Sequence, residues 1–448
     1  MIAPHASRFA VHGYLFAVGC LLIACASVPP PVAVRPPAPT TNTPVALTLW
    51  HAQPDASAAL LNALANDFHK AYPTITVRVE SKASDGDVLR QGLAAIALNQ
   101  APDLVITDQR TLAEFARRGA LTSLDAWMAD PRQGLRDEER ADFSPGLLDA
   151  GRVPELKNQT LAFPFAPRAV VLYYNADLLK GAGAQVPRTW EHFSQSARAT
   201  TRGSTRGWAM LPNAAVLYAC LFSRGGSVLN DAQTQAQFGD DAGLKTLQLI
   251  TALTKSGAAY LADSAESART DFAQGKTALW FGTTDDLYPL AEALARPHSS
   301  PSGMLRDLQW GVINVPQGDP AHPVTASEGA NLAIFRTSEE RVRAAWLFAR
   351  WLTAPEQSAR WSRVTLRIPV RLSAYTLLAM NLPPLLLRLR DGFGDALPTV
   401  RATPTVKDAE FIDASIVETW ANVANGADHA AALKAAAARV NRILGNIP

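Results

Sequence analysis

The chain has 448 residues, of which 48% are hydrophobic and 18% are charged, so it is long enough to form two lobes that each bury a core. Its 42 basic and 40 acidic residues leave a formal net charge of +2. No basic run of the kind that follows the phosphates of a nucleic acid is present. We therefore expect no nucleic-acid partner.

The first 25 residues predict a secretory signal. A weakly basic start precedes an apolar run over 9–24, which is short for a membrane span. The run ends in Leu22-Ile23-Ala24-Cys25, which resembles the bacterial lipobox, where the cysteine becomes the lipid-carrying first residue. We expect lipid on Cys25 to anchor the chain without spanning the bilayer. A plain signal peptide cut elsewhere and an uncleaved anchor are the alternatives.

Residues 26–46 are rich in Pro and Thr and nearly uncharged, which predicts a semi-rigid stalk. Cysteine usage fits a processed chain, because Cys20 and Cys25 fall in the signal and only Cys220 remains in the body. This excludes a disulfide within the mature domain and a zinc site made of thiolates. Apolar neighbours predict that Cys220 is an inert buried thiol.

Strands and helices alternate after the stalk. Strands are predicted at 47–50, 75–79 and 103–107, with a helix between the first two and further helices at 91–99 and 114–120. This order predicts a mainly parallel sheet covered on both faces, with a ligand crevice beyond the carboxyl ends of its strands. Four residues fall at such ends: Trp50, His51, Ser81 and Asp108.

The middle of the chain holds two apolar runs, 160–165 and 169–174, with Pro164 and Pro167 keeping them apart. Each run predicts a buried strand. We expect this kinked segment, which contains Arg168, to carry the chain from one lobe to the other past a ligand. Buried strands of a sandwich are the alternative.

The second half repeats the pattern of the first. It predicts a helix from Trp190 capped by Thr189, a helix over 242–256, strands at 277–281 and 310–313, a helix after the capping box at 337–340, and a final helix over 428–444. These elements predict a second α/β lobe.

The ordered set of motifs resembles the family 1 extracellular solute-binding proteins of bacterial ABC importers, a group that includes maltodextrin-like and glycerol-3-phosphate-like binders. The resemblance runs from about residue 47 to residue 445. It rests on ANDFHKAYPTITVRVE at 65–80, APDLVITD at 101–108, LAFPFAPRAVVLYYNADLLKGAG at 161–183, DFAQGKTALWFGTTDDL at 271–287 and SEGANLAI at 327–334.

The resemblance implies a two-lobed periplasmic-binding-protein fold of type II. Each α/β lobe has a mainly parallel sheet flanked by helices, and three crossings join the lobes. We expect an N-lobe from 47–163 and 329–362 and a C-lobe from 164–328 and 363–448. The last crossing is expected near 360–374.

The same resemblance implies a binding protein without covalent chemistry, cofactor or metal. It would take a sugar or related polar solute, glycerol 3-phosphate-like compounds included, into the cleft and deliver it to the permease subunits of an ABC importer. We expect a monomer outside the cytoplasm, lipid-anchored in the periplasm or on the outer cell surface.

Two functions of other classes stay open. A secreted lipoprotein enzyme acting on carbohydrate would need a carboxylate pair across the cleft, although the sequence has no His-Glu-x-x-His, Gly-x-Ser-x-Gly or Cys-x-x-Cys motif. A ligand-sensing subunit of a signalling receptor would use the same cleft as an importer. Paired tyrosines such as Tyr173-Tyr174 also bind ferric ion in some related proteins, but neighbouring strand residues face opposite sides, so only one would reach a cleft.

Ligand-binding residues are expected from position and chemistry, because sugars suit an aromatic platform beside charged or amide side chains. Trp50 fits such a platform or the core, and Asp108 fits a hydroxyl acceptor or a helix cap. The full set is Trp50, His51, Ser81, Asp108, Arg168, Tyr173, Thr283, Thr284, Asp285, Glu328, Gly329, Asn331 and Arg371.

Two groups in this set bear on the ligand. The arginines, Arg168 and Arg371, suit a phosphate or carboxylate. The loop at 283–285 stands where many sugar-binding relatives place an aromatic residue, which puts a long oligosaccharide in doubt and favours a small polar or phosphorylated ligand.

Overall fold

Parallel strands form the first part of the sheet in the computed structural model, which describes residues 44–295, 308–379, 384–393 and 399–445. Strands β1 (Val45–His51), β2 (Ile75–Ser81) and β3 (Leu104–Asp108) lie in the order β2–β1–β3. Leu49 lies opposite Val79 on one side and opposite Leu104 on the other. The alternating strands and helices expected from the sequence are thus present here.

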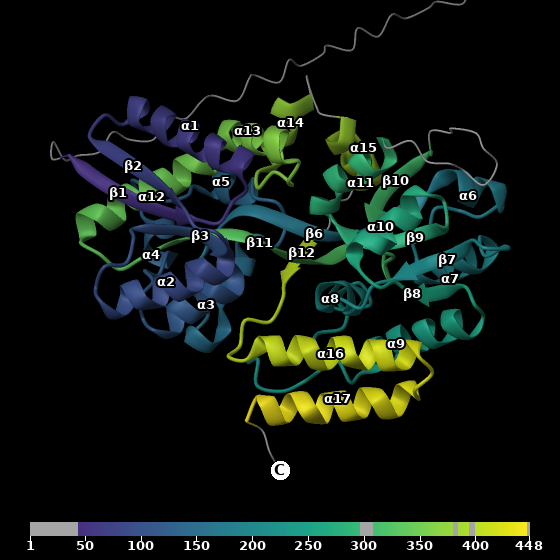
Figure 1. The fold of residues 1–448 in the computed structure, drawn as a ribbon. Helices are drawn as coiled ribbons and strands as arrows, with labels where there is room; N and C mark the ends of the chain where they lie inside the picture. Colours follow the sequence, from purple (N-terminus) through teal and green to yellow (C-terminus); the bar gives the residue numbers. More distant parts are fainter. Residues whose placement is uncertain (1–43, 296–307, 380–383, 394–398, 446–448) are drawn as a thin grey trace, which may run out of the picture. The chain divides into compact units, whose positions relative to one another are not determined.

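Helices cover both faces of these strands, and together they form the N-lobe. They are α1 (Asp55–Ala71), α2 (Asp85–Ala97), α3 (Gln109–Arg117), α4 (Asp125–Ala129), α5 (Asp137–Ala141), α12 (Glu339–Leu352), α13 (Pro355–Thr365) and α14 (Leu372–Ala379). On one face α1 and α12 pack together, with the Phe68 and Phe348 rings 5.0 Å apart. On the other face α2 and α3 pack around Val105 and Phe115 (Figure 1).

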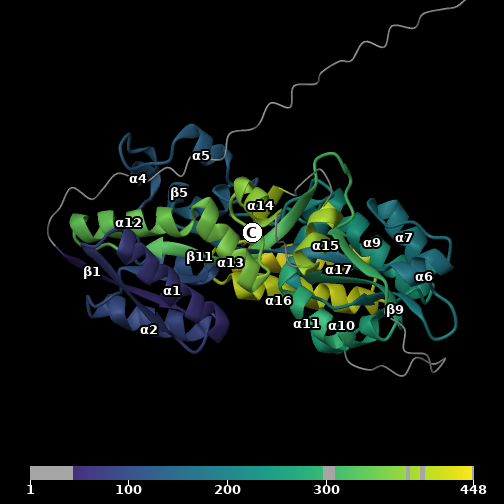
Figure 2. The same ribbon diagram turned by 90° about the horizontal axis from the view of Figure 1, so that it is seen from above.

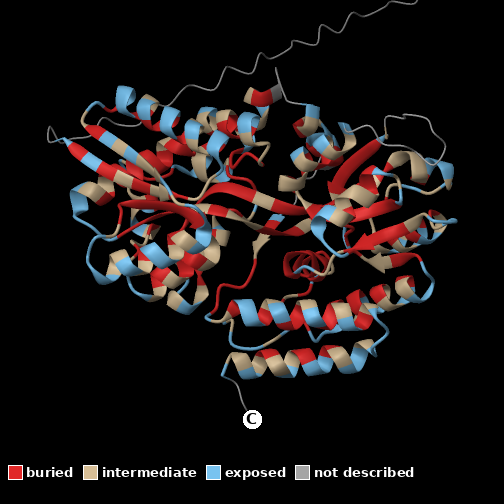
Figure 3. Cartoon of the chain, in the orientation of Figure 1, coloured by how far each residue is buried: buried red, intermediate tan, exposed pale blue. Residues whose placement is uncertain are grey.

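Two long strands, β6 (Phe163–Asn175) and β11 (Val324–Ile334), run from the N-lobe into the C-lobe. The end of β11 pairs antiparallel with β3, and its middle, from Ser327 to Leu332, pairs antiparallel with β6. Figure 3 shows both strands as largely buried, which agrees with their apolar sequences. They form two of the connections between the lobes.

A single strand of 13 residues, Phe163–Asn175, runs through Pro164 and Pro167, so the expected break at the prolines is wrong, and Thr160 belongs to a separate short strand, Gln159–Thr160. The ladder between β6 and β11 shifts register between Ala330 and Asn331, opposite Ala166 and Pro164. This irregularity accommodates the prolines, which cannot donate a backbone hydrogen bond.

The C-lobe surrounds the second half of β6. Its strands are β7 (Arg206–Met210), β8 (Ala259–Leu261), β9 (Thr277–Thr283) and β10 (Trp310–Asn314). Its helices are α6 (Ala176–Gly181), α7 (Trp190–Ala199), α8 (Ala214–Phe222), α9 (Asp241–Lys255), α10 (Ala265–Ala273), α11 (Leu287–Ala295), α15 (Pro384–Phe393), α16 (Ala409–Ala424) and α17 (His429–Ile443).

Alternate side chains of β6 point to the two faces of the C-lobe sheet. Val170 and Leu172 pack with α8, α9 and α16, whereas Val171 and Tyr173 pack with α10, α11 and α15. All nine residues of α8 are buried, as expected for a helix that is apolar on every side. Figure 2 gives the same arrangement from above.

Short elements complete the connections. Before β6 come the turns η1 (Asp149–Gly151) and η2 (Pro154–Leu156) and the small antiparallel pair β4 (Arg152–Val153) and β5 (Gln159–Thr160). The turn η3 (Thr284–Asp286) follows β9, and β12 (Thr399–Ala402) pairs in parallel with the start of β11.

The predicted lobe boundaries are close to features of the structure but do not coincide with all of them. β1 begins at Val45, inside the predicted stalk. Val370 and Arg371 pack with the N-lobe, beyond the predicted change of lobe at residue 362. The predicted signal and the lipid site at Cys25 lie outside the described residues. None of the helices in the described ranges is both long and apolar enough to cross a membrane.

Candidate functional site

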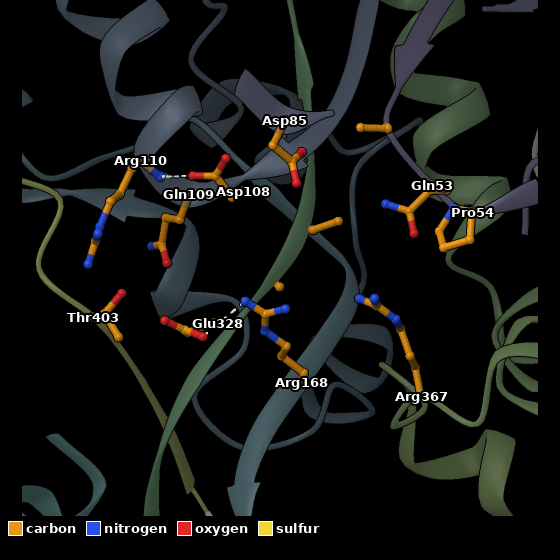
Figure 4. A pocket seen from close by; sticks show the side chains of 13 residues that line it. Gln53, Pro54, Asp85, Asp108, Gln109, Arg110, Arg168, Glu328, Arg367 and Thr403 are labelled. Carbon is orange, nitrogen blue, oxygen red and sulfur yellow. Dashed lines mark hydrogen bonds and ion pairs between the residues drawn. The ribbon is translucent and has the colours of Figure 1, made fainter. Parts of the chain in front are cut away.

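A cavity of about 470 Å³ lies where the carboxyl ends of β1 and β3 meet the crossing strands β6 and β11. Figure 4 shows side chains from these elements, from α3 and from the segment after α13 around a common space. The lining residues are Ala52, Gln53, Pro54, Asp85, Asp108, Gln109, Arg110, Arg168, Glu328, Gly329, Ala330, Arg367 and Thr403. This is the location expected for a ligand crevice in an α/β sheet.

Arg168 lies at the crossing of β6 and contacts two carboxylates. Its guanidinium donates to Glu328 Oε2 at 3.0 Å and lies 3.7 Å from Asp285 Oδ2. Burial acts to lower the pKa of Arg168, but the carboxylates of Glu328 and Asp285 outweigh it, so the pKa is raised. The buried Nε of Arg168 has no hydrogen-bond partner among the described residues.

Arg367 contributes a second guanidinium from the segment between α13 and α14. It donates to Asp285 Oδ2 at 3.0 Å and to the carbonyl of Ala166 at 2.9 Å. Burial lowers the pKa of Arg367, and the nearby charge of Arg168 lowers it further against the opposing effect of Asp285. The guanidinium groups of Arg168 and Arg367 thus flank the same oxygen, Asp285 Oδ2, at 3.7 Å and 3.0 Å, and Figure 4 shows both lining the cavity. Planar donors in this arrangement suit a carboxylate, a phosphate or closely spaced hydroxyls.

Two aspartates reach the cavity from the N-lobe, and their roles differ. Asp108 caps α3 by accepting hydrogen bonds from the backbone of Arg110 and Thr111, so the helix-cap role weighed from the sequence is present. Asp85 lies in the first turn of α2 and accepts from Thr107 Oγ1 at 2.7 Å. Burial, with a smaller contribution from the charge of Asp108, raises the pKa of Asp85.

The first turn of α3 also supplies Gln109 and Arg110. The Gln109 amide donates to the carbonyl of Ala150. Arg110 forms an ion pair with Asp413 on α16, in the C-lobe. Burial acts to lower the pKa of Arg110, but Asp413 outweighs it and the pKa is raised. The cavity is therefore bounded by contacts that join the two lobes.

Four of the residues expected from the sequence line this cavity: Asp108, Arg168, Glu328 and Gly329. Asp285 does not line it but contacts both Arg168 and Arg367. Gly329 has a φ of 125°, and a Cβ there would lie 2.6 Å from the carbonyl oxygen of Ala166. Glycine at position 329 therefore lets the backbone of β11 lie close to the backbone of the neighbouring strand β6.

Three expected residues at the ends of β1 and β2 do not line the cavity. The ring of Trp50 packs with the α2–α3 side of the core, and Lys82 Nζ lies 3.8 Å from its centre. His51 is 1% exposed, its Nδ1 accepts from the backbone of Gln53, and burial lowers its pKa. Ser81 is exposed at the end of β2.

Three further residues expected to bind ligand, Tyr173, Thr283 and Thr284, do not line the cavity but hold the turn after β9 in place. Tyr173 is fully buried, stacks on Trp280 at 5.0 Å and donates to the carbonyl of Thr283 at 2.7 Å. Burial raises its pKa well above the usual value. Thr283 caps η3, and the buried Thr284 accepts from the backbone of Ala169. These contacts hold the turn that presents Asp285.

Arg371 lies outside the cavity, in contrast to its expected role. Its guanidinium is buried, donates to the carbonyls of Thr353 and Glu139, and stacks over the ring of Phe143 at 3.6 Å. Burial lowers its pKa to about 10. Asn331, which lies opposite Thr107 in the sheet, is also absent from the lining.

Sequence reasoning did not identify Gln53, Pro54, Asp85, Gln109, Arg110, Arg367 and Thr403 as lining residues. Several had a usable signal, since they follow β1, β2 or β3 within a few residues. Arg367 and Thr403 had none, because only tertiary packing brings their segments to the cavity.

The described residues contain no group of three His, Cys, Asp or Glu side chains placed to hold a metal ion. Cys220 is buried, and burial raises the pKa of its thiol to about 12, which fits the inert thiol predicted from its neighbours. The lining of the cavity can bind a solute through hydrogen bonds and charge, chiefly from its arginines and from the carboxylates paired with them.

Known proteins resemble this chain over about three quarters of its length. The sn-glycerol-3-phosphate-binding periplasmic protein UgpB of Rhizobium meliloti (strain 1021) is 23% identical over 344 residues, which cover 73% of this chain and 76% of that protein. UgpB of Salmonella typhimurium is 22% identical over 349 residues, covering 74% of this chain and 75% of that protein.

Solved structures show the same two-lobed fold. The cyclic alpha-maltosyl-1,6-maltose binding protein from Arthrobacter globiformis has a TM-score of 0.75 at 21% identity, covering 90% of this chain and all of its own. UgpB from Mycobacterium tuberculosis in complex with glycerophosphocholine has a TM-score of 0.68 at 22% identity, covering 90% of this chain and 98% of its own. The model of a family described as bacterial extracellular solute-binding protein matches residues 52–359. The chain therefore belongs to the bacterial extracellular solute-binding protein family.

Proposed function

We propose that this protein is the solute-binding component of an ABC importer and that it binds a polar solute in the cavity between its lobes. The observation that carries the proposal is the placing of Arg168, Glu328 and Arg367 at the crossings, where side chains from both lobes converge. A ligand favours the closed state only through its differential affinity for that state, so it must contact both lobes. Closure then presents the loaded protein to the permease.

The chemistry of the lining defines the solute class. Among the described residues no aromatic side chain lines the cavity, whereas three arginines and three carboxylates do. Guanidinium groups recognise the oxygens of phosphates, carboxylates and vicinal hydroxyls. A hydroxylated solute with one anionic group fits these donors, and the glycerol-phosphate binders among the relatives support that choice. The sugar binders among the solved structures support a neutral carbohydrate as the other candidate.

The same proposal places the protein outside the cytoplasm. The family match and the lipobox at Cys25 support a chain that is lipid-anchored to the membrane beside its permease, and we propose that it acts there as a monomer.

A thermal-shift screen tests the proposed function. The purified protein is heated with glycerol 3-phosphate, maltose, other sugars, amino acids and ferric ion in separate samples. A solute at a hundredfold excess over its Kd adds about 2.7 kcal/mol to the stability of the folded state, which raises the Tm. We expect a shift with a glycerol phosphate or a sugar that is recovered unchanged. Slow hydrolysis of a glycoside without any shift would support a carbohydrate-active enzyme instead.

A further inference from the structure

Leu366 joins helix α13 to the segment that carries Arg367 to the binding cavity, and its backbone is left-handed, with φ of 59° and ψ of 14°. Residues other than glycine, asparagine and aspartate rarely adopt this conformation, because the Cβ comes too close to a carbonyl oxygen. A leucine keeps such a backbone only where the surrounding structure holds it there, and strain of this kind gathers at functional sites.

No other α-helix of the described ranges has leucine as its left-handed end residue. A left-handed residue also follows α2, α3, α6, α9, α10, α16 and α17. It is asparagine after α2, where Asn99 has a φ of 54°, and glycine after the other six. Glycine is the ordinary residue at such a helix end. Stopping the helix therefore does not by itself explain a leucine at position 366.

The side chain of Leu366 supplies a contact that glycine lacks. It packs with the apolar cluster of the C-lobe that contains Val171 and Ile368. The helix before it belongs to the N-lobe, where Trp361 packs on Phe165 with ring centres 4.6 Å apart. The chain thus changes from N-lobe packing to C-lobe packing at Leu366.

Hydrogen bonds define the turn at Leu366. Its backbone N–H donates to the carbonyl of Ser362 at 2.9 Å, which completes the last turn of α13. The next backbone N–H, of Arg367, donates to Thr365 Oγ1 at 3.3 Å. Arg367 therefore leaves the helix directly after the left-handed residue.

The direction of the Arg367 side chain depends on this exit from the helix. Its guanidinium donates to the carbonyl of Ala166 on β6 at 2.9 Å and to Asp285 Oδ2 on η3 at 3.0 Å. Figure 4 shows Arg367 among the side chains that line the cavity. Each residue of an α-helix is rotated by about 100° from the one before, so continuing α13 through residue 366 would turn residue 367 in another direction.

We propose that Leu366 is a positioning residue for solute binding. Its left-handed backbone ends α13 and directs Arg367 into the cavity, and the packing of its side chain in the C-lobe offsets the cost of that backbone. A solute held by Arg367 then depends on Leu366 without touching it. This inference rests on the proposed function, and it gives a role in binding to a residue that does not line the cavity.

Two substitutions separate the backbone of Leu366 from its side chain. Leu366→Gly removes the side chain and keeps a residue that adopts the left-handed backbone freely. Leu366→Val keeps an apolar side chain, but its branched Cβ strongly disfavours that backbone. Asn99→Gly and Asn99→Val are the matched controls, because Asn99 has the same backbone after α2 and does not line the cavity.

Calorimetry measures the Kd of glycerol 3-phosphate, of maltose and of any other solute that the thermal-shift screen identifies. Leu366→Val should raise the Kd about tenfold, the size of one lost hydrogen bond to a charged group, because Arg367 is displaced. Leu366→Gly should raise it less, by about twofold, because glycine keeps the backbone. Asn99→Val should lower the stability and leave the Kd unchanged.

A double-mutant cycle with Arg367→Gln distinguishes positioning from a general structural role. Leu366→Val should raise the Kd no further in Arg367→Gln protein, because the group that it displaces is already gone. Urea denaturation gives the same test without solute. The loss of stability caused by Arg367→Gln should shrink in Leu366→Val protein, since the contacts with Ala166 and Asp285 are already broken.

If Leu366→Val does not fold, Leu366→Ala takes its place, because alanine also disfavours a left-handed backbone. A larger rise in Kd for Leu366→Gly than for Leu366→Val, or additive losses of stability in the cycle, would overturn the positioning role while the importer function stands. Failure of every solute to bind would overturn the proposed function, and non-additive stability would then still support the control of Arg367 by Leu366.

Discussion

The carboxylate of Asp413 on α16 binds the guanidinium of Arg110 on α3, so a residue of the C-lobe holds a residue that lines the binding cavity from the N-lobe. The other oxygen of Asp413 accepts from the hydroxyl of Tyr218 on α8. Burial raises the pKa of that hydroxyl well above its usual value. We expect this contact to couple the position of Arg110 at the cavity to the closure of the lobes.

Asp413→Asn should weaken solute binding about fivefold, because a partly buried charged hydrogen bond across the lobes is weakened in the closed state. Small-angle scattering should show a larger radius of gyration for the variant at the same solute concentration. The control is Asp241→Asn, which removes an exposed pair with Lys245 on α9 and should change neither quantity. Unchanged affinity in Asp413→Asn would mean that the Arg110–Asp413 contact does not contribute to closure.

Arg371→Gln should lower stability without weakening the binding of solute by the folded protein. The variant loses buried hydrogen bonds to the carbonyls of Thr353 and Glu139 and the contact with Phe143, a loss of about 2–4 kcal/mol. Urea denaturation measures the stability, and titration below the transition measures the Kd. A large rise in the Kd for solute with unchanged stability of Arg371→Gln would show that Arg371 does bind the solute.

Gly329→Ala should destabilise the protein by about 1–3 kcal/mol, since a φ of 125° is open almost only to glycine and the new Cβ would lie 2.6 Å from the carbonyl oxygen of Ala166. Gly181→Ala is the control, because a Cβ there has no neighbour within 4 Å and the residue ends a helix. Equal melting temperatures for the two variants would show that the close approach at Gly329 relaxes at no cost.

The neutral, buried state of His51 should make stability fall on acidification. Burial lowers the folded-state pKa of His51 below its ordinary value of 6.5, so the unfolded chain binds a proton more readily. Its contribution is therefore fully present above pH 6.5 and is lost as the pH falls from there through the folded-state pKa. His51→Asn should flatten the curve of unfolding free energy against pH below 6.5, and an unchanged curve would show that His51 does not cause the loss of stability.

The sequence predicted those parts of the site that follow from strand ends and crossings. Asp108 ends β3 and Glu328 lies opposite Arg168 in the paired crossing strands, so local pattern and family resemblance placed them near the ligand. The sheet of alternating strands and helices was predictable for the same reason, because hydrophobic period and turn residues are local properties.

The site residues that were placed wrongly or missed depend on tertiary packing, which the local sequence does not reveal. Arg367 and Arg371 flank the same short segment, and the ring of Phe143 and the carbonyl of Thr353 decide that Arg371 is buried in the N-lobe. Tyr173 shares a strand with Arg168 but points to the core side of the C-lobe. Asp413 is 303 residues from Arg110 and carries no local motif.

The most direct measurement is the Kd of a solute found by the thermal-shift screen, determined by calorimetry for the unmodified protein and for Arg168→Gln. If the cavity at the crossings is the solute site, the unmodified protein binds one solute molecule, and Arg168→Gln loses about a hundredfold in affinity because a partly buried charged donor shared with Glu328 is gone. An unchanged Kd in a folded Arg168→Gln protein would place the solute elsewhere and contradict the proposed site.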